Sequence, residues 1–325
     1  MSIQKFQKYF EEAILNIRDL KHNGNNQLFE IITNSKKFIL KKYESFHMDN
    51  WKRGVNEFKA LDYLWKEGFR EIPQAIYFDE SQNIGIYSYE EGRVLNAFEI
   101  KEKDINNAVE FLVKLHNLKD KSFFGQASSA CLNLKEYVDV LDRRVNSLFN
   151  YEITDPITKK AKRFFSKEVI KKIDELKTDF YQKTKKYNLE KDLSIEEQVL
   201  TPADFGFHNI LVDNNKYKFI DFEYFGRDDP ARQVLDFIHH AQSFEIKDNL
   251  KKHFLDYYIE KKDSSKDFKK RLELINPLIA MTWILIPLNV FCKNRIKNFD
   301  LQKESTKEIL EKRLFNAQKK FNLNF

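Results

Sequence analysis

The chain has 325 residues, of which 42% are hydrophobic and 33% are charged, so we expect a globular protein large enough for two lobes or domains. Its two cysteines, Cys131 and Cys292, are too few for a disulfide framework or a zinc site, which predicts a reducing, cytoplasmic compartment. The net charge of +6 comes largely from lysine-rich helices that Asp and Glu interrupt, and since no nucleic-acid-binding motif accompanies it, no nucleic acid partner is predicted.

The N-terminal stretch 1–18 is amphipathic and lacks the charged start and apolar run of a secretory signal. Its apolar residues recur at helical spacing, which predicts a leading helix over 1–18. These residues are Phe6, Phe10, Ile14 and Ile17. The most apolar stretch, 277–291, is shorter than the roughly 20 residues that a membrane helix needs. We therefore expect a buried helix there and no membrane span.

The next part of the chain alternates short apolar segments with turns. Polar turns at 23–26 and 33–37 separate segments rich in Ile, Phe and Leu, which predicts an antiparallel meander of three strands. A helix over about 51–67 follows, and after it two strands, near 74–79 and 84–90, complete a β-rich region.

From about residue 104 onward the pattern is helical, except in the region 199–225. The change in character falls near residue 92, so we predict a β-rich N-terminal lobe over 1–92 and a helical C-terminal lobe over 93–325. Such a chain belongs to the α+β class with a two-lobe arrangement.

The segment "TPADFGFHNILVDNNKYKFIDFEYFGRDDP", residues 201–230, has the most informative spacing. Asp204 and Asn209 lie in a loop, and two short apolar strands joined by a polar turn then lead to Asp221. A hairpin brings its two ends together, so these three residues should share one edge, where their oxygens would suit Mg²⁺. Asp204 would be placed to receive a hydroxyl proton, as phosphoryl transfer requires. Turn-rich Asp and Asn without a function remain the alternative.

Two parts of this segment resemble the aminoglycoside phosphotransferase and choline kinase branch of the protein-kinase-like fold. "ADFGFHNIL" is similar to that family's catalytic loop, H-x-D-x-x-x-x-N, and "FIDFEYFGRDDP" to its metal-binding strand end. The resemblance covers roughly residues 20–240 and implies that Asp204 is the catalytic base and that Asn209 and Asp221 hold Mg²⁺. The family histidine two residues before the base is Pro202 here, a departure that bears on activity and not on fold.

The same resemblance implies a nucleotide site in the N-terminal lobe. Lys41, at the end of the third strand, matches the lysine that holds the ATP phosphates, and Glu57 on the next helix matches its partner. The turn 21–26, with Asn25, stands where a phosphate-covering loop belongs, although a plain hairpin turn is equally compatible. The family's backbone contacts adenine at the lobe junction, at positions that correspond here to Tyr89, Glu90 and Glu91.

The acceptor site is less defined by the sequence. Glu223 and Asp228 would suit a cationic acceptor such as an amine, whereas Asp229 followed by Pro230 predicts a helix cap. Trp283 would stack on a sugar or a quaternary ammonium, or else pack in the helical core.

These features together predict an ATP- and Mg²⁺-dependent phosphotransferase that acts on a hydroxyl of a small molecule such as an amino alcohol or a sugar. A nucleotide-binding module without transfer activity and a protein kinase are the alternatives. The sequence has no activation segment ending in A-P-E after Asp221, which argues against protein kinase activity. The sequence leaves the acceptor, the oligomeric state and the choice between ATP and GTP open.

Overall fold

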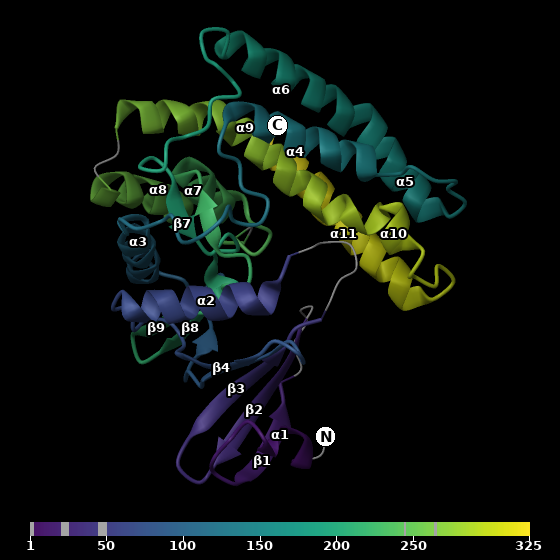
Figure 1. Ribbon diagram of the computed structural model, residues 1–325. Coiled ribbons are helices and arrows are strands. Elements are labelled where there is room, and N and C mark those ends of the chain that lie inside the picture. The colour runs from purple at the N-terminus through teal and green to yellow at the C-terminus, as the bar shows by residue number, and fades with distance from the viewer. Residues whose placement is uncertain (1–2, 21–25, 45–50, 244, 263–264) are drawn as a thin grey trace. The chain divides into compact units, whose positions relative to one another are not determined.

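The computed structural model describes residues 3–20, 26–44, 51–243, 245–262 and 265–325 (Figure 1). Two compact units are distinguished by their internal contacts. The first unit comprises the described residues up to Ala130 together with Val199–Asp228 and Glu245–Lys261; the rest of the described chain forms the second unit. The predicted α+β class is confirmed, with a sheet near the N-terminus and a mostly helical remainder. The lobe boundary at residues 92 and 93 stays a prediction.

An antiparallel sheet of five strands forms the N-terminal part of the first unit (Figure 1). In spatial order its strands are β1 (Ile14–Asp19), β2 (Gln27–Thr33), β3 (Lys37–Lys42), β5 (Ile84–Ser88) and β4 (Ala75–Asp79). The predicted meander corresponds to the first three of them. The helix α2 (Arg53–Lys66) packs against β4 and β5, with Glu57, Ala60, Leu61 and Leu64 among its buried residues.

The predicted leading helix over 1–18 is wrong. The structure has a short helix, α1 (Gln4–Gln7), and then β1, which pairs with β2 as the edge strand of the sheet. Phe6 and Ile14 are both buried in one core cluster with Phe29 of β2. Over so short a run, apolar residues at helical spacing also fit a turn followed by a strand. Without β1, the backbone groups along the outer edge of β2 would be unpaired, and pairing with them favours a strand over a helix.

Short strands hold residues 201–228 in the same unit. The predicted hairpin is present as β8 (Ile210–Asp213) and β9 (Lys216–Phe219), and β6 (Arg93–Val94) adds a third strand. The turn residues Asn214 and Asn215 have φ angles of 45° and 65°, which asparagine tolerates and which tight hairpins require. β9 ends at Phe219, so Asp221 lies just beyond the strand and not at its last position.

Two further short strands pair with each other. They are β7 (Val199–Thr201), which precedes the hairpin in the sequence, and β10 (Gly226–Asp228), which follows it. The helices α3 (Glu102–His116) and α8 (Asp248–Lys262) belong to the same region. A 2.7 Å hydrogen bond between His116 Nδ1 and Tyr258 Oη joins these two helices, and both side chains are buried.

Helices make up the second unit. They are α4 (Leu134–Ser147), α5 (Pro156–Phe164), α6 (Ile170–Lys183), α7 (Pro230–His239), α9 (Lys266–Leu288), α10 (Lys293–Ile296) and α11 (Glu304–Asn324). A π-helical turn over Phe165–Val169 joins α5 to α6. α9 is the central element, since it packs against α4, α6, α7 and α11.

One helical segment among the described residues, Lys266–Phe291, is long and apolar enough to cross a membrane by length and composition. Of its most apolar window of 18 residues, 56% is buried inside the protein. Leu278, Met281 and Leu285 are among the fully buried side chains on α9, so the expected buried helix over 277–291 describes this segment.

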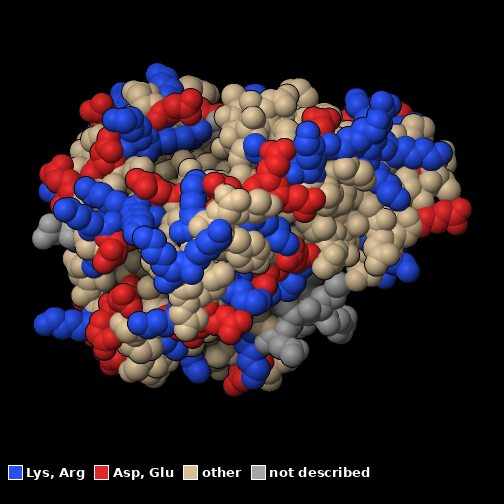
Figure 2. Space-filling model, turned by 90° about the horizontal axis from the view of Figure 1, so that it is seen from above, with Lys and Arg blue, Asp and Glu red and all other residues tan. Residues whose placement is uncertain are grey.

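Opposite charges are interspersed on the surface. Figure 2 shows Lys and Arg side chains lying among Asp and Glu side chains over the face that it presents. On the lysine-rich α6, two lysines form ion pairs with acidic residues about one helical turn away. Lys183 lies 2.7 Å from Asp179, and Lys172 lies 3.2 Å from Glu175. Lysines of this helix are therefore partnered locally, as expected for a solvated helix face.

Asp229 caps α7, as the sequence predicts, with Pro230 at the first helical position. Its carboxylate accepts hydrogen bonds from the Ala231 N–H (2.8 Å) and from Tyr137 Oη (2.6 Å), and it also accepts one from Arg271 Nε. Burial would lower the pKa of Arg271, but the Asp229 carboxylate outweighs this effect and raises it. The fully buried Asp229 is therefore both a cap and one half of an ion pair.

Replacing Asp229 with Ala is expected to lower the free energy of unfolding by roughly 3–5 kcal/mol, because Arg271 loses its buried partner. Asp155 offers a matched control: it also caps a helix before a proline, but the capping bond comes from Thr158 alone. Its replacement with Ala should cost about 1 kcal/mol. Urea unfolding followed by circular dichroism measures both, and equal losses for the two variants would contradict the ion-pair role.

Candidate functional site

Lys41 lies at the centre of a buried ionic cluster. It occupies β3 between Leu28 of β2 and Gly85 of β5, and it is 6% exposed. Its Nζ atom lies 2.7 Å from Glu57 Oε2 and 2.6 Å from Asp221 Oδ1. A third carboxylate oxygen, Glu223 Oε2, lies 3.8 Å away. Three of the predicted site residues are thus brought together around one ammonium group.

The carboxylates outnumber the ammonium group that they surround. Burial alone would lower the pKa of Lys41, but Asp221, Glu57 and Glu223 together raise it well above its ordinary value. Burial, together with repulsion from Asp221, raises the pKa of Glu223. Oxygens of these three acids lie within 4.8 Å of one another, so an additional cation would be stabilised here.

Glu57 is held in place by donors on three sides. Its Oε2 accepts hydrogen bonds from Lys41 and from Tyr43 Oη, both at 2.7 Å, and its Oε1 accepts one from the Phe222 N–H at 3.3 Å. The Tyr43 hydroxyl is itself 2.7 Å from the Tyr87 hydroxyl. Both tyrosines are buried, and burial is the main cause that raises the pKa of each. They remain neutral and fix the carboxylate that faces Lys41.

Gly85 makes room for this tyrosine pair. A Cβ atom at Gly85 would lie 2.6 Å from the ring carbon Cε2 of Tyr87, closer than real contacts allow. Tyr87 is 3% exposed and bound to Tyr43, so its ring has little space into which to move.

Replacing Gly85 with Ala is therefore expected to lower the free energy of unfolding by about 1–3 kcal/mol, as overpacking does. The displaced Tyr87 should also loosen the support of Glu57. Gly125→Ala is the control, since a Cβ atom at Gly125 meets nothing within 4 Å. Thermal unfolding of both variants measures the difference, and a neutral Gly85→Ala would show that the tyrosine pair adapts freely.

The backbone that follows Asp221 is anchored to the N-terminal part of the chain. Trp51 Nε1 donates to the Glu223 carbonyl oxygen at 2.6 Å, and Asn56 Nδ2 donates to the same oxygen at 3.1 Å. The Glu223 side chain accepts from Asn26 Nδ2 at 2.7 Å. Glu223 is 5% exposed beside Lys41, so little of it is available to the cationic acceptor for which the sequence suggested it.

The turn 21–26 is described only in part. Asn25, the predicted phosphate contact, lies outside the described residues, whereas its neighbour Asn26 is the residue that binds Glu223. Neither Asn26 nor Trp51 was identified from the sequence. Both partners are far from Glu223 along the chain, and no spacing rule connects them.

The loop that carries Asp204 has an unusual backbone. Ala203 has a φ of 66°, in the left-handed region that residues with a Cβ atom rarely adopt. Its N–H donates to Thr201 Oγ1 at 3.0 Å, and the Asp204 N–H donates to the Pro202 carbonyl oxygen at 2.9 Å. This tight turn after β7 leaves Asp204 half-buried. Strain of this kind is often found at active sites.

Asn209 connects Asp204 to the segment that carries Asp221. Asn209 Nδ2 donates to the Asp204 carbonyl oxygen at 3.0 Å, which leaves its Oδ1 as the side-chain group for another ligand. The Ile220 N–H donates to the Asn209 carbonyl oxygen, also at 3.0 Å. Asp221 follows with a φ of 68°. The amide of Asn209 and the carboxylate of Asp221 therefore belong to adjoining, hydrogen-bonded backbone segments.

A histidine that the sequence analysis did not single out contacts Asp204. His208 Nε2 lies 3.0 Å from Asp204 Oδ1, and the two side chains are 22% and 37% exposed. The residues from Phe207 to Asn209 form a 3-10 turn, which brings position 208 back towards position 204. The position of His208 four residues after Asp204 in the same loop was the sequence signal that could have identified it.

The three lobe-junction residues lie just after β5. Glu90 accepts hydrogen bonds from Ser88 Oγ and Lys218 Nζ, both at 2.6 Å. Lys37 Nζ lies 3.0 Å from Glu91 and 4.8 Å from the centre of the Tyr89 ring. Tyr89 and Glu91 also line a hollow of about 540 Å³ beside the turn between β2 and β3. Their proposed contact with adenine stays a prediction.

Two candidate acceptor residues differ in accessibility. Asp228, on β10, is 2% exposed, so little of it is available to a ligand. Trp283, on α9, is half-buried, and its Nε1 donates to Asp236 Oδ1 at 2.7 Å. The His240 ring lies 4.4 Å from the Trp283 ring, measured between ring centres, and Lys320 Nζ lies 5.9 Å from the centre of the Trp283 ring.

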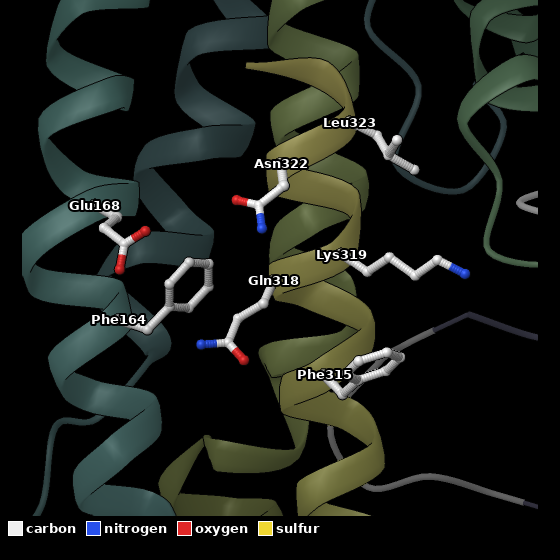
Figure 3. A pocket seen from close by; sticks show the side chains of 7 residues that line it. All are labelled: Phe164, Glu168, Phe315, Gln318, Lys319, Asn322 and Leu323. Carbon is white, nitrogen blue, oxygen red and sulfur yellow. The ribbon is translucent and has the colours of Figure 1, made fainter.

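A separate groove of about 460 Å³ lies in the helical unit. Figure 3 shows Gln318 and Asn322 of α11 directed towards the segment that carries Phe164 and Glu168, whereas Lys319 points to the opposite side of α11. None of the candidate site residues lines it, so the candidate site rests on the ionic cluster and the loop described above.

Comparisons with known proteins bear on this arrangement. Residues 16–267 match the model of the phosphotransferase enzyme family, which is most of the chain. No curated protein matches the chain in sequence. Among solved structures, a spectinomycin phosphotransferase in complex with ADP and spectinomycin has a TM-score of 0.65 at 14% identity, covering 98% of this chain and 97% of that one.

Two choline kinases are similar to a comparable extent. The enzyme from Cryptosporidium parvum has a TM-score of 0.59 at 14% identity, covering 96% of this chain and 90% of that one. The enzyme from Streptococcus pneumoniae has the same TM-score and identity and covers 97% of both chains. These likenesses confirm the kinase-like fold. Together with the family match over residues 16–267, they show that the chain belongs to the phosphotransferase enzyme family.

Proposed function

We propose that the chain is an ATP- and Mg²⁺-dependent phosphotransferase that phosphorylates a hydroxyl of a small molecule, such as an amino alcohol or a sugar. The observation that carries this proposal is the buried Lys41 cluster, in which one ammonium group binds both Glu57 and Asp221. Similar structures solved with ADP or AMP support nucleotide binding. We place the protein in the cytoplasm, where ATP is available.

The chemistry of the residues fits Mg²⁺. Asp221 and Asn209 offer hard oxygen ligands, and Glu223 adds a carboxylate near Asp221. Mg²⁺ takes one or two protein carboxylates and fills its remaining positions with phosphate oxygens and water. When bound there, it would neutralise charge on the transferred phosphate. Lys41, held by Glu57, would bind phosphate oxygens of the nucleotide by a charge-assisted hydrogen bond.

Asp204 would act on the acceptor. In the transfer step, the acceptor oxygen forms a bond to the γ-phosphorus while the bond from that phosphorus to the β,γ-bridging oxygen breaks. ADP leaves with the bridging oxygen, and the hydroxyl proton passes to the Asp204 carboxylate. Most of the rate gain would come from the positioning of these groups and from the fixed charges around them.

Trp283 is the acceptor contact that we propose among the candidates, because this residue is half-buried whereas Asp228 is buried. For Glu223 we propose a role on the nucleotide side, next to Lys41. For Tyr89, Glu90 and Glu91 we propose contact with the adenine through the backbone.

The proposal is tested by following ADP release from Mg·ATP with amino alcohols, sugars and aminoglycosides as acceptors. Mass spectrometry of each mixture then identifies a product that has gained one phosphoryl group. We expect turnover with one acceptor class. Tight binding of Mg·ATP without a phosphorylated product from any acceptor class would favour a nucleotide-binding module instead.

A further inference from the structure

The loop around Asp204 has a side-chain contact that the family motif does not contain. The motif places a histidine two residues before the base, and this chain has Pro202 there, which carries neither a side-chain donor nor a backbone N–H. The histidine of this loop lies four residues after the base instead. His208 Nε2 is 3.0 Å from Asp204 Oδ1.

Backbone contacts determine where His208 lies. The Asn209 N–H donates to the Gly206 carbonyl oxygen at 2.9 Å, which closes the 3-10 turn. On the other side, the Asn209 side chain donates to the Asp204 carbonyl oxygen at 3.0 Å. These bonds hold positions 204 and 208 within reach of each other, so the contact between the two side chains does not require a flexible loop to close.

The chemistry of the contact defines its direction. An ionised carboxylate accepts hydrogen bonds but does not donate them, so His208 Nε2 carries the proton that the Asp204 Oδ1 atom accepts. This bond fixes the rotation of the carboxylate about its own axis. The carboxylate that receives the acceptor proton is then held in a defined orientation.

We propose that His208 is a positioning residue for Asp204, and that it orients the carboxylate which receives the acceptor proton. The proposal rests on the proposed phosphotransferase function. It gives His208 no proton-transfer step of its own, since its contribution is the hydrogen bond to Oδ1.

Three variants test this role: His208→Ala, His208→Gln and Asp204→Asn. ADP release from Mg·ATP is measured with water as the acceptor and with the best compound of the acceptor panel. His208→Ala should lower kcat about 10- to 100-fold, the range for loss of a hydrogen bond to a charged group, with Mg·ATP affinity unchanged within about twofold. Gln carries an N–H at nearly the reach of Nε2, so His208→Gln should restore most of kcat.

A double-mutant cycle separates positioning from support of the loop. In an Asp204→Asn background, His208→Ala should have little further effect on kcat, because the carboxylate that it orients is gone. An equal loss in both backgrounds, or a parallel loss of Mg·ATP affinity, would overturn the proposal. His253→Gln serves as a control, since this histidine bonds Asn106 on α3, away from the loop.

The two proposals fail in different ways. If no acceptor in the panel gains a phosphoryl group, the phosphotransferase proposal fails. If Asp204→Asn leaves turnover unchanged, Asp204 is not part of the reaction and the role of His208 fails, while the phosphotransferase proposal stands. If Asp204→Asn lowers kcat while His208→Ala does not, only the role of His208 is overturned.

Discussion

Replacing Asp204 with Asn is expected to lower kcat by about 10²–10⁴-fold, the usual contribution of a general base. The amide has nearly the shape of the carboxylate but does not take up the acceptor proton. Its loop should keep its structure, because the hydrogen bonds of this turn run from the Ala203 N–H to Thr201 Oγ1 and from the Asp204 N–H to the Pro202 carbonyl oxygen, and neither uses the Asp204 side chain. Initial rates of ADP release at saturating Mg·ATP measure the effect.

Asp213→Asn is the control for this substitution, because Asp213 lies on β8 and its carboxylate bonds the neighbouring Asn214 in the hairpin turn. It should retain wild-type turnover, and both variants should bind Mg·ATP as the wild type does. Retention of full activity in Asp204→Asn would remove Asp204 from the reaction.

Replacing Lys41 with Met is expected to weaken both nucleotide binding and the fold. Removal of one partner from a buried ionic cluster costs roughly 3–5 kcal/mol of unfolding free energy, because Glu57 and Asp221 lose their shared ammonium group. Loss of a charge-assisted bond to phosphate should also weaken Mg·ATP binding about 10- to 100-fold. Urea unfolding and calorimetric titration measure the two effects.

A second substitution separates electrostatics from packing. With Lys41 absent, the charge on Glu223 adds to the repulsion among the buried acids, so Glu223→Gln should recover part of the lost stability in the Lys41→Met protein. Lys42→Met is the control, since Lys42 is the adjacent lysine on β3 and is half-buried. If Lys42→Met destabilises the protein as much as Lys41→Met does, loss of the ionic cluster is not the cause of the lower stability of Lys41→Met.

The sequence predicted those parts of the fold whose signals are local. The strands β2, β3, β4 and β5 alternate with turns, and the hairpin of β8 and β9 is marked by Asn214 and Asn215. The helix predicted over 1–18 was wrong, because Phe6 and Ile14 are buried with Phe29 at the edge of the sheet and not along one face of a helix. Tertiary contacts outweigh spacing in so short a segment.

The site was predicted where it follows the order of a known motif. Lys41 and Glu57 were matched by their place on a third strand and on the next helix, and the structure puts them 2.7 Å apart. The contacts of Glu223 were not predictable in this way, since Trp51 is 172 positions away and Asn26 is 197 positions away. Local rules do not describe partners at such separations, which arise only when the chain has folded.

The tyrosine pair and His208 illustrate the same limit at shorter range. Tyr43 and Tyr87 read as ordinary apolar positions of two strands, and only the pairing of β3 with β5 brings their hydroxyl groups together behind Glu57. His208 follows Asp204 closely, but the contact depends on the 3-10 turn at Phe207–Asn209. Sequence spacing indicated a loop there and not its internal hydrogen bonds.

The most direct test of the phosphotransferase account is a calorimetric titration of the wild-type protein with ATP, with and without Mg²⁺. The account predicts saturable binding at one site, which weakens when Mg²⁺ is omitted and weakens likewise in Asp221→Asn. This measurement does not depend on knowing the acceptor. Absence of saturable binding at millimolar Mg·ATP would contradict the account, because the cluster around Lys41 would then not form a nucleotide-binding site.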